Sequence, residues 1–373
     1  MYDYLLMAPG PVPLSPEVKH ILAEDMIHHR SPLFQAALDS VMAKLPNVFA
    51  CDGKVLFFTS TGTGAMEACM LNFVGPGDKV AVVNSGKFGE RWLQMAYRIG
   101  CEVIEIPVKW GESLKLEQVT HVLEQHPDLD AFFTQYCETS TGALHPVKQI
   151  ASYIKERQAS CLVAVDAITA VLTTELNMRE WGIDLCVAGS QKAFMLPTGL
   201  GFLAISEHAE ERIKKDRPFL YFDITQELKA RKSGQTAYSS NVPLIRALDM
   251  VLEKIEQDGL QNFISNVQAR AELCRRALAV MNLEIYPQNP APALTAFRSP
   301  EGMDGAKLRN HLEERYNLTL MGGQEHLKGK ILRIGHMGHL SHANISDAMI
   351  RLAHGLADFS YEVDMQKLEK ALS

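Results

Sequence analysis

Lys192 is the residue of this sequence whose position most needs an explanation. It follows the apolar run Leu185–Ala188 and the short turn Gly189–Ser190, so its backbone should emerge from the protein core. Most lysines are solvated surface residues. Lys192 is therefore either a surface lysine whose stem lies along a strand end, or an amine that the protein needs at this place.

Asp166 ends a second apolar run, Cys161–Val165. A buried carboxylate is costly unless a cation or hydrogen-bond donors accompany it. Its side chain either caps the segment that follows or pairs with the protonated ring nitrogen of a ligand.

The stretch "TGTG" at 61–64 predicts a turn that opens a helix. A helix N-terminus presents free N–H groups and partial positive charge, and glycine lets an anion approach the backbone. One interpretation is a phosphate site to which the hydroxyls of Thr61 and Thr63 add donors. The other is an ordinary helix cap. The stretch is neither a Walker loop nor a G-x-G-x-x-G motif.

Short apolar runs alternate with amphipathic helical patterns from about residue 54 to 215. This alternation predicts an α/β fold with right-handed crossovers and a mostly parallel sheet. Ligands of such sheets bind outside the carboxyl ends of the strands, which is where the three features above should lie. The expected strands are Val55–Thr59, Lys79–Val83, Glu102–Ile106, Ala131–Gln135, Cys161–Val165, Leu185–Ala188 and Gly201–Ile205. The expected helices include Ala65–Phe73, Phe88–Ile99, Leu116–Gln125 and Pro146–Arg157.

The pattern changes after about residue 240 and predicts a smaller α+β domain. Two long helices are expected on either side of Gly259, and the second should bridge the two domains. We divide the chain into an N-terminal segment (1–15), a large domain (16–258) and a small domain (259–373). The elements expected after residue 240 are helices Val242–Gln257, Leu260–Met281, Gly305–Tyr316 and Ala343–Leu356, and strands Leu294–Arg298, Leu318–Met321 and Ile331–Ile334.

An amine, a strand-end carboxylate and a phosphate cradle together meet the needs of one cofactor, pyridoxal 5'-phosphate (PLP). With these features the sequence resembles the class V aminotransferases, PLP enzymes of fold type I. Within that group it is most similar to the alanine/serine–glyoxylate and serine–pyruvate aminotransferases. The implied fold is aspartate aminotransferase-like, with a mostly parallel large domain and a smaller α+β C-terminal domain. The matching stretches occur in family order and are "APGPVPLSPEV" (8–18), "TSTGTGAMEA" (59–68), "SGKFGERW" (85–92), "ETSTG" (138–142), "VDAITA" (165–170), "GSQKAF" (189–194) and "LRIGHMG" (332–338).

The resemblance implies a role for each residue that matches the family motifs. Lys192 would form the Schiff base with PLP, and Asp166 would keep the pyridine nitrogen protonated. Phe88 would stack on the ring, although it could equally be a core residue of its helix, and Thr139 would contact the ring. The phosphate would be held by Thr61, Gly62, Thr63 and Gln191.

Arg333 matches the arginine that binds the substrate carboxylate in this family. A planar guanidinium binds a carboxylate through two parallel hydrogen bonds, and an arginine within an apolar strand needs an anion. The alternative is a structural ion pair. Gly10, in "PGP" at 9–11, would offer its backbone to the substrate.

The family site is shared across a homodimer, in which the neighbouring chain adds phosphate contacts. The matching stretch here is "AYSSNVPLIRAL" at 237–248. Tyr238 fits the family tyrosine. Asn241 stands where many members have threonine, and its amide can still donate to a phosphate.

The implied activity is that of a transaminase of the EC 2.6.1 type. It would move the amino group of alanine or serine to glyoxylate or pyruvate by a ping-pong mechanism. One alternative is a cysteine desulfurase or lyase of the same superfamily. That group prefers histidine before the lysine and a catalytic cysteine on a late loop, whereas this chain has Gln191 and only Cys274. The other alternative is a protein that binds PLP without turnover.

Composition restricts the partners that we expect. The net charge of -7 gives no electrostatic footprint for nucleic acid. No apolar run approaches the roughly 20 residues of a membrane span, and the N-terminus makes a poor signal peptide. Seven scattered cysteines without a C-x-x-C pair indicate reduced thiols in a cytoplasmic protein. The histidines at 28–29 and at 336, 339 and 342 are clustered, but we expect no metal site and assign the His28-His29-Arg30 run no role.

Overall fold

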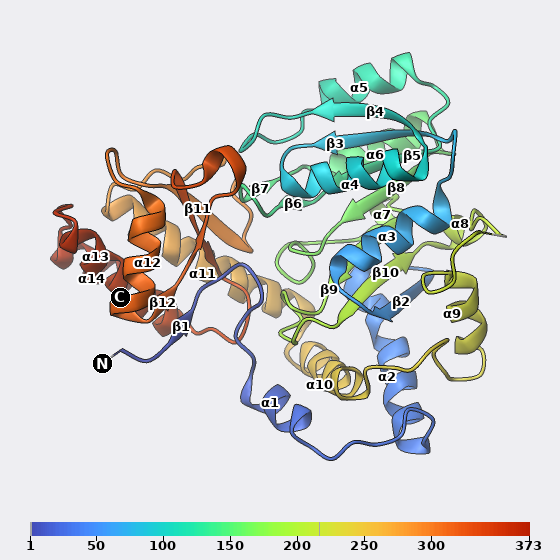
Figure 1. Cartoon of the computed structure of the whole chain (residues 1–373), viewed down its shortest axis with the longest axis horizontal. Helices are drawn as coiled ribbons and strands as arrows, with labels where there is room; N and C mark the ends of the chain where they lie inside the picture. Colours follow the sequence, from blue (N-terminus) through green and yellow to red (C-terminus); the bar gives the residue numbers. More distant parts are fainter. Residues whose placement is uncertain (1, 216) are drawn as a thin grey trace.

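The centre of the molecule is a seven-stranded sheet in the order β2-β10-β9-β8-β5-β3-β4 (Figure 1). The computed structural model describes residues 2–215 and 217–373. All neighbouring strands are parallel except β10, which is antiparallel to β2 and β9. The mostly parallel sheet expected from the sequence is confirmed. In sheet order the strands are β2 (Lys54–Thr59), β10 (Leu200–Ile205), β9 (Leu185–Gly189), β8 (Leu162–Asp166), β5 (Ala131–Gln135), β3 (Lys79–Asn84) and β4 (Glu102–Pro107).

Helices cover both faces of this sheet (Figure 1), so its inner strands are buried and mostly apolar. Successive side chains of a strand point to opposite faces. Val163 and Val165 of β8 accordingly belong to the apolar cluster formed with α2, α5, α6 and α10, and Leu162 and Ala164 to the cluster formed with α3 and α4. These helices are α2 (Pro32–Phe49), α3 (Gly62–Phe73), α4 (Lys87–Ile99), α5 (Leu116–Gln125), α6 (Val147–Arg157) and α10 (Val242–Asp258); the shorter ones are α7 (Met178–Trp181), α8 (Glu207–Glu210) and α9 (Ile224–Arg231).

The carboxyl-terminal elements form a second lobe beside the sheet, drawn in orange and red in Figure 1. A three-stranded sheet in the order β11-β14-β13 lies there with a separate apolar cluster. Gly259, at φ 84°, separates α10 from the next helix, as expected. The elements are α11 (Leu260–Val280), β11 (Leu294–Arg298), α12 (Gly305–Tyr316), β12 (Leu318–Thr319), β13 (Met321–Gly322), the 3-10 helix η1 (Glu325–Leu327), β14 (Ile331–Gly335), α13 (His342–Asp358) and α14 (Met365–Leu372).

The N-terminal segment is built into this second lobe. Strand β1 (Leu5–Leu6) pairs in parallel with β12. At the next residue, the Met7 carbonyl accepts a hydrogen bond from the Gly335 N–H at 2.7 Å. The chain then reaches the edge of the large sheet at Pro9 before α1 (Pro16–Leu22) begins. The segment therefore connects the substrate-binding strand expected at Arg333 with the expected cofactor lysine.

Helix α2 is a long element that the sequence analysis did not predict. Ser31 caps it by accepting the Phe34 N–H, and Pro32 occupies its first turn, which is the favoured arrangement for a helix start. Pro46 within the helix obscured the pattern. The domain boundaries given above stay predictions. Among the described residues, no helix combines the length and apolarity that a bilayer crossing requires.

Candidate active site

Lys192 lies in the loop that follows β9 and is almost completely buried, with 8% of its surface exposed. Its Nζ donates a hydrogen bond to the carbonyl of Pro9. Burial lowers the pKa of the amine to about 8. The surface-lysine alternative is therefore wrong, and a larger fraction of this amine is unprotonated at neutral pH than of an ordinary lysine.

Asp166 is the last residue of β8 and is 4% exposed. Its Oδ1 accepts the N–H of Ile168 at 2.9 Å, so the capping predicted as one alternative is present. Among the described residues no cation lies within ion-pair distance of the carboxylate. Burial raises its pKa to about 7. A protonated ring nitrogen at this place would supply the positively charged partner that the carboxylate lacks.

The turn at 61–64 opens α3, as expected. Thr61 caps the helix by accepting the Gly64 N–H at 3.4 Å. Gly62 lies directly against Ile168, because a Cβ at residue 62 would come within 2.6 Å of the Ile168 Cδ1. The turn is thus held next to the end of β8, and its first N–H groups point away from any helical acceptor. This arrangement suits a phosphate.

Gln191 provides an orphaned polar group beside the same turn. Its Oε1 is buried without a hydrogen-bond partner among the described residues. A Cβ at Gly189 would lie 2.9 Å from this oxygen and 3.5 Å from the Cα of Gly62. The oxygen and nitrogen of an amide are assigned from their surroundings, and rotation of this amide by 180° would turn an NH2 donor toward a phosphate. The residues present therefore fit the phosphate end of PLP.

Phe88 lies in the first turn of α4 and is half-buried, so it is not a core residue of that helix. The guanidinium of Arg91 lies 4.8 Å from the centre of the Phe88 ring, and its Nη1 donates to Thr63 Oγ1 at 2.8 Å. The structure thus connects the expected ring platform with the expected phosphate turn through Arg91. Sequence reasoning did not single out Arg91; its spacing of three residues from Phe88 on a helix is the signal that could have found it.

Arg333 lies within β14 and is 7% exposed. Its Nε and Nη2 donate to the Gly322 carbonyl at 3.0 and 2.8 Å, and its Nη1 donates to the Thr139 carbonyl at 2.7 Å. Among the described residues no carboxylate lies within 4 Å, so the structural ion pair considered above is absent. Burial lowers the pKa of the guanidinium to about 10. The side chain is a buried cation without an anion.

Thr139 and Gly10 complete the immediate surroundings. The Thr139 hydroxyl is 2.7 Å from that of Thr169. Gly10 has φ +122°, and a Cβ there would come within 2.6 Å of the Lys192 Nζ. Only glycine at residue 10 therefore leaves enough space for the Lys192 amine.

Tyr238 and Asn241 lie on the surface near the end of β2, apart from the buried group. Tyr238 is 37% exposed and stacks on Tyr221, whose hydroxyl donates to the Thr59 carbonyl. Asn241 caps α10 by accepting the Leu244 N–H. Neither side chain makes a hydrogen bond to Lys192 or to the 61–64 turn of the same chain.

The histidine clusters do not form a metal site in the described residues. No group of three or more His, Cys, Asp or Glu side chains is arranged there to hold an ion. His336 is buried and contacts the Pro292 carbonyl through Nδ1, whereas His339 and His342 are exposed. His28 and His29 are neighbouring rings on the surface.

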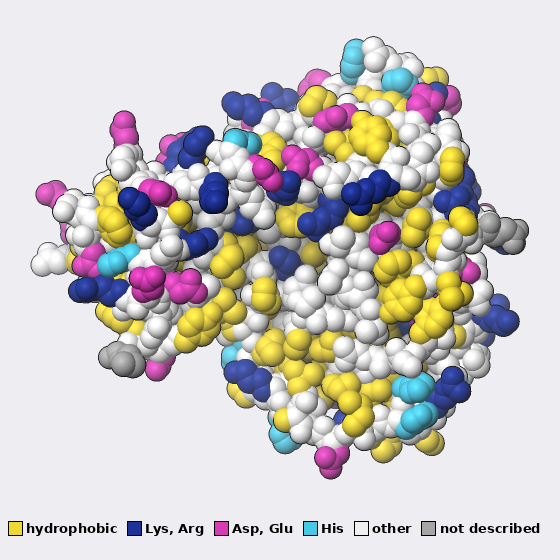
Figure 2. Space-filling view, viewed as in Figure 1, with side chains coloured by type: hydrophobic (Ala, Val, Ile, Leu, Met, Phe, Trp, Pro, Cys, Tyr) yellow, Lys and Arg dark blue, Asp and Glu magenta, His cyan; other side chains and the backbone are white. Residues whose placement is uncertain are grey.

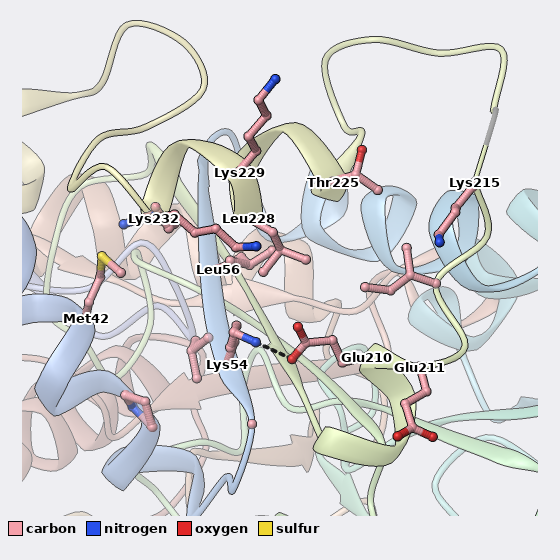
Figure 3. A pocket seen from close by; sticks show the side chains of 15 residues that line it. Met42, Lys54, Leu56, Glu210, Glu211, Lys215, Thr225, Leu228, Lys229 and Lys232 are labelled. Carbon is pink, nitrogen blue, oxygen red and sulfur yellow. Dashed lines mark hydrogen bonds and ion pairs between the residues drawn. The ribbon is translucent and has the colours of Figure 1, made fainter.

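A hollow of about 710 Å³ lies at the other end of β2 (Figure 3). Its lining combines apolar side chains such as Leu56 with several lysines, and Lys54 is paired with Glu210. Lys54 and Thr59 are the two ends of β2, roughly 17 Å apart at the usual rise of a strand. The hollow is therefore outside the candidate active site.

Comparison with known protein families identifies the chain. The family model described as "Aminotransferase class-V" matches residues 18–354. The chain belongs to the class V aminotransferases. As a transaminase of this family it has the fold that the sequence analysis expected, and the family implies PLP as its cofactor.

Similar proteins cover almost the whole length of this aminotransferase. A serine–glyoxylate aminotransferase of Methylorubrum extorquens is 29% identical over 96% of this chain and 92% of its own. Among solved structures, an aspartate aminotransferase of Thermus thermophilus is 32% identical, with a TM-score of 0.90 over 95% of this chain and 99% of its own. An alanine–glyoxylate aminotransferase of Nostoc is 29% identical, with a TM-score of 0.90 over 95% and 96%.

Replacement of Asp166 by Asn should stabilise the protein in the absence of cofactor. The pKa of Asp166 is about 7 in the folded chain, against 3.8 for an unperturbed aspartate, so the folded state binds the proton more tightly. Stability is then lost as the pH rises through this range. Urea unfolding of the apoprotein should show Asp166→Asn more stable than wild type at pH 8, by roughly 4 kcal/mol at most. The difference should shrink as the pH falls and vanish only below about pH 4, where the carboxyl is protonated in both states.

Asp184→Asn is the matched control for this experiment. Asp184 is also a buried carboxylate beside the large sheet, but it binds Lys155 at 2.6 Å and the Val163 N–H at 2.7 Å. Its replacement removes a satisfied partner and should destabilise the apoprotein at every pH tested. A loss of stability in both variants would show that Asp166 has a partner in the folded chain.

Proposed function

We propose that this class V aminotransferase binds PLP through Lys192 and moves the amino group of a small neutral amino acid to glyoxylate or pyruvate. The observation that carries the proposal is a set of three buried ionisable groups, Lys192, Asp166 and Arg333, none of which has an ion-pair partner among the described residues. A carbonyl would suit Lys192, a basic ring nitrogen would suit Asp166, and a substrate carboxylate would suit Arg333.

Each residue then has a defined task. PLP, when bound, supplies a carbonyl carbon for the amino group and an aromatic ring that accepts electrons from the substrate Cα. Lys192 Nζ removes the proton from Cα and later delivers it, acting first as general base and then as general acid. Asp166 holds the proton on the ring nitrogen, and Arg333 holds the carboxylate of the amino acid.

One contact favours a small neutral donor, and the names of similar proteins favour glyoxylate as the acceptor. Lys87, a cation at the start of α4, is already paired with Glu90 at 2.8 Å and with Glu325 at 2.9 Å. It is therefore not free for the second carboxylate of a dicarboxylic donor. The names of the similar proteins differ in their donors, which are serine, aspartate and alanine, and two of the three share glyoxylate.

The desulfurase alternative is not supported by the position of the cysteine it requires. Cys274 is buried within α11, where burial raises the pKa of its thiol to about 12. Such a thiol is neither mobile nor a good nucleophile. All seven cysteines are free thiols, and six are buried, which agrees with a reducing compartment such as the cytoplasm.

We also propose that the active enzyme is a homodimer with shared sites. Tyr238 is exposed beside the end of β2, where it stacks on the exposed Tyr221 and its hydroxyl donates to the carbonyl of the exposed Leu220. Figure 2 shows hydrophobic side chains gathered on the face over α2, α9 and α10. A second copy packed there would bury this surface and could bring its Tyr238 and Asn241 to the phosphate turn.

Replacement of Lys192 by Ala tests the central assignment. The variant should lose the absorbance of the Schiff base and at least about 10³-fold in kcat, because no other described amine is buried at this edge. Assays should combine alanine, serine and aspartate as donors with glyoxylate and pyruvate as acceptors. Turnover of Lys192→Ala at the wild-type rate would contradict the assignment of Lys192 as the Schiff-base lysine. Aspartate as the best donor would overturn the proposal of a neutral donor.

Arg333→Gln should weaken the binding of the amino acid rather than of the cofactor. Loss of a charge-assisted contact to a carboxylate costs about 1.5–3 kcal/mol, so KM for alanine should rise about 10- to 100-fold. Ethylamine, which has no carboxylate, is the control: its slow reaction should be the same in both proteins. An equal loss with both amines would contradict the role of Arg333.

Mixed dimers test whether Tyr238 acts on the partner's site. Lys192→Ala and Tyr238→Ala chains would each be weak as homodimers at limiting PLP. In a mixed dimer, one site carries both defects and the other carries neither. Mixing should therefore restore activity if Tyr238 acts across the interface. No restoration, despite exchange of subunits shown by mass spectrometry, would mean that Tyr238 serves its own chain.

A further inference from the structure

Glu138 is a completely buried carboxylate that none of the roles above uses. It is the last residue of the short strand β6 (Cys137–Glu138) and directly precedes Thr139. Both of its oxygens are occupied. Oε2 accepts the N–H groups of Phe88 at 3.1 Å and Gly89 at 3.2 Å, and Oε1 accepts the N–H and the hydroxyl of Ser140 at 3.1 and 2.6 Å.

Two of these donors are the free N–H groups at the start of α4. The residue that precedes this helix, Gly86, has no side chain to cap it, so Glu138 supplies the cap from another part of the chain. Three of the neighbours are backbone N–H groups, which can only donate. These donors and the positive end of the helix favour the ionised form of the carboxylate, against the effect of burial, which raises its pKa. A Cβ at Gly86 would come within 2.5 Å of Glu138 Cδ, so glycine there permits this close approach.

The same carboxylate is joined to the substrate-binding arginine. The Thr139 carbonyl, one residue along, accepts Arg333 Nη1 at 2.7 Å. Glu138 is close enough to act on the charge of Arg333, yet the two form no ion pair because α4 and Ser140 occupy both carboxylate oxygens. Arg333 thereby stays open to an external carboxylate.

We propose that Glu138 is a positioning residue of this aminotransferase. Its carboxylate ties the start of α4, which carries Phe88, to the segment that carries Thr139, and so fixes the ring platform relative to Arg333. This inference rests on the proposed function of Phe88, Thr139 and Arg333. It differs from a purely structural helix cap, which would stabilise the fold without affecting ligands.

Glu138→Gln separates these two roles. The amide keeps the shape but can present only one oxygen to four donors, so Phe88 and Thr139 lose their common anchor. We expect the dissociation constant of PLP, measured by quenching of intrinsic fluorescence, to rise about tenfold. At saturating PLP, KM for the amino donor should also rise about tenfold, with a smaller change in kcat.

Asp184→Asn is again the matched control, because it alters a buried carboxylate that lies apart from Phe88 and Thr139. Both variants should lower the unfolding temperature of the apoprotein, but only Glu138→Gln should change the PLP dissociation constant and the donor KM. A Glu138→Gln protein with a lowered unfolding temperature and with both constants within twofold of wild type would overturn the proposal.

A second variant keeps the test decisive if Glu138→Gln does not fold. Ser140→Ala removes the shortest of the four hydrogen bonds, together with the acceptor of the Lys87 N–H at the start of α4, and leaves the carboxylate in place. It should raise the same two constants in the same direction by about two- to fourfold, and unchanged constants would overturn the proposal. If the wild-type protein binds PLP but transfers no amino group, the proposed function fails, while the PLP measurements still decide the role of Glu138.

Discussion

The structure depends on keeping charged side chains buried without counter-ions at the carboxyl ends of one parallel sheet. An isolated charge in a protein interior is expensive, and the usual outcome is a shifted pKa. Asp166 and Lys192 follow this rule: burial brings the pKa of the carboxylate up to about 7 and that of the amine down to about 8. Both groups therefore have pKa values close to neutral pH, which suits acid–base chemistry. The free energy for this arrangement must come from the apolar clusters on both faces of the sheet.

Close backbone approaches make the arrangement possible. Gly10 brings the N-terminal segment against the Lys192 amine, and a Cβ at Gly335 would come within 2.3 Å of the Ala8 carbonyl oxygen. The same segment continues a strand pairing with β12. Residues 7–10 therefore lie against the Lys192 amine and the Arg333 strand although they are far from both in sequence. An insertion or a larger side chain here would displace Lys192, Arg333 or both.

Local sequence patterns were sufficient for the sheet and for the residues at its edge. The inner strands β8 and β9 are buried on both faces, so each reads as a nearly uninterrupted apolar run, and a polar residue at or just after its end stands out. This is how Lys192 and Asp166 were found. Glu138 was missed because its contact with the Phe88 N–H joins residues 50 positions apart, and such a pairing has no period or spacing in a single sequence. Arg91 was missed although it lies three residues after Phe88 on the same helix. The partners of Arg333 were unpredictable for another reason: they are backbone carbonyls, which every residue type provides.

Carbonyl partners do not by themselves distinguish Arg333 from another buried arginine of this fold. Arg270 binds the carbonyls of His336 and Leu340, and burial lowers its pKa to about 10 as well. Carbonyl partners alone therefore do not identify a substrate site, since Arg270 uses them to join a helix to a loop. Arg333 is different because its charge acts on Lys192 and because a neighbouring carboxylate, Glu138, is held away from it by other donors. A guanidinium fixed by neutral dipoles keeps its full charge for an incoming carboxylate, whereas an ion pair would have to be broken first.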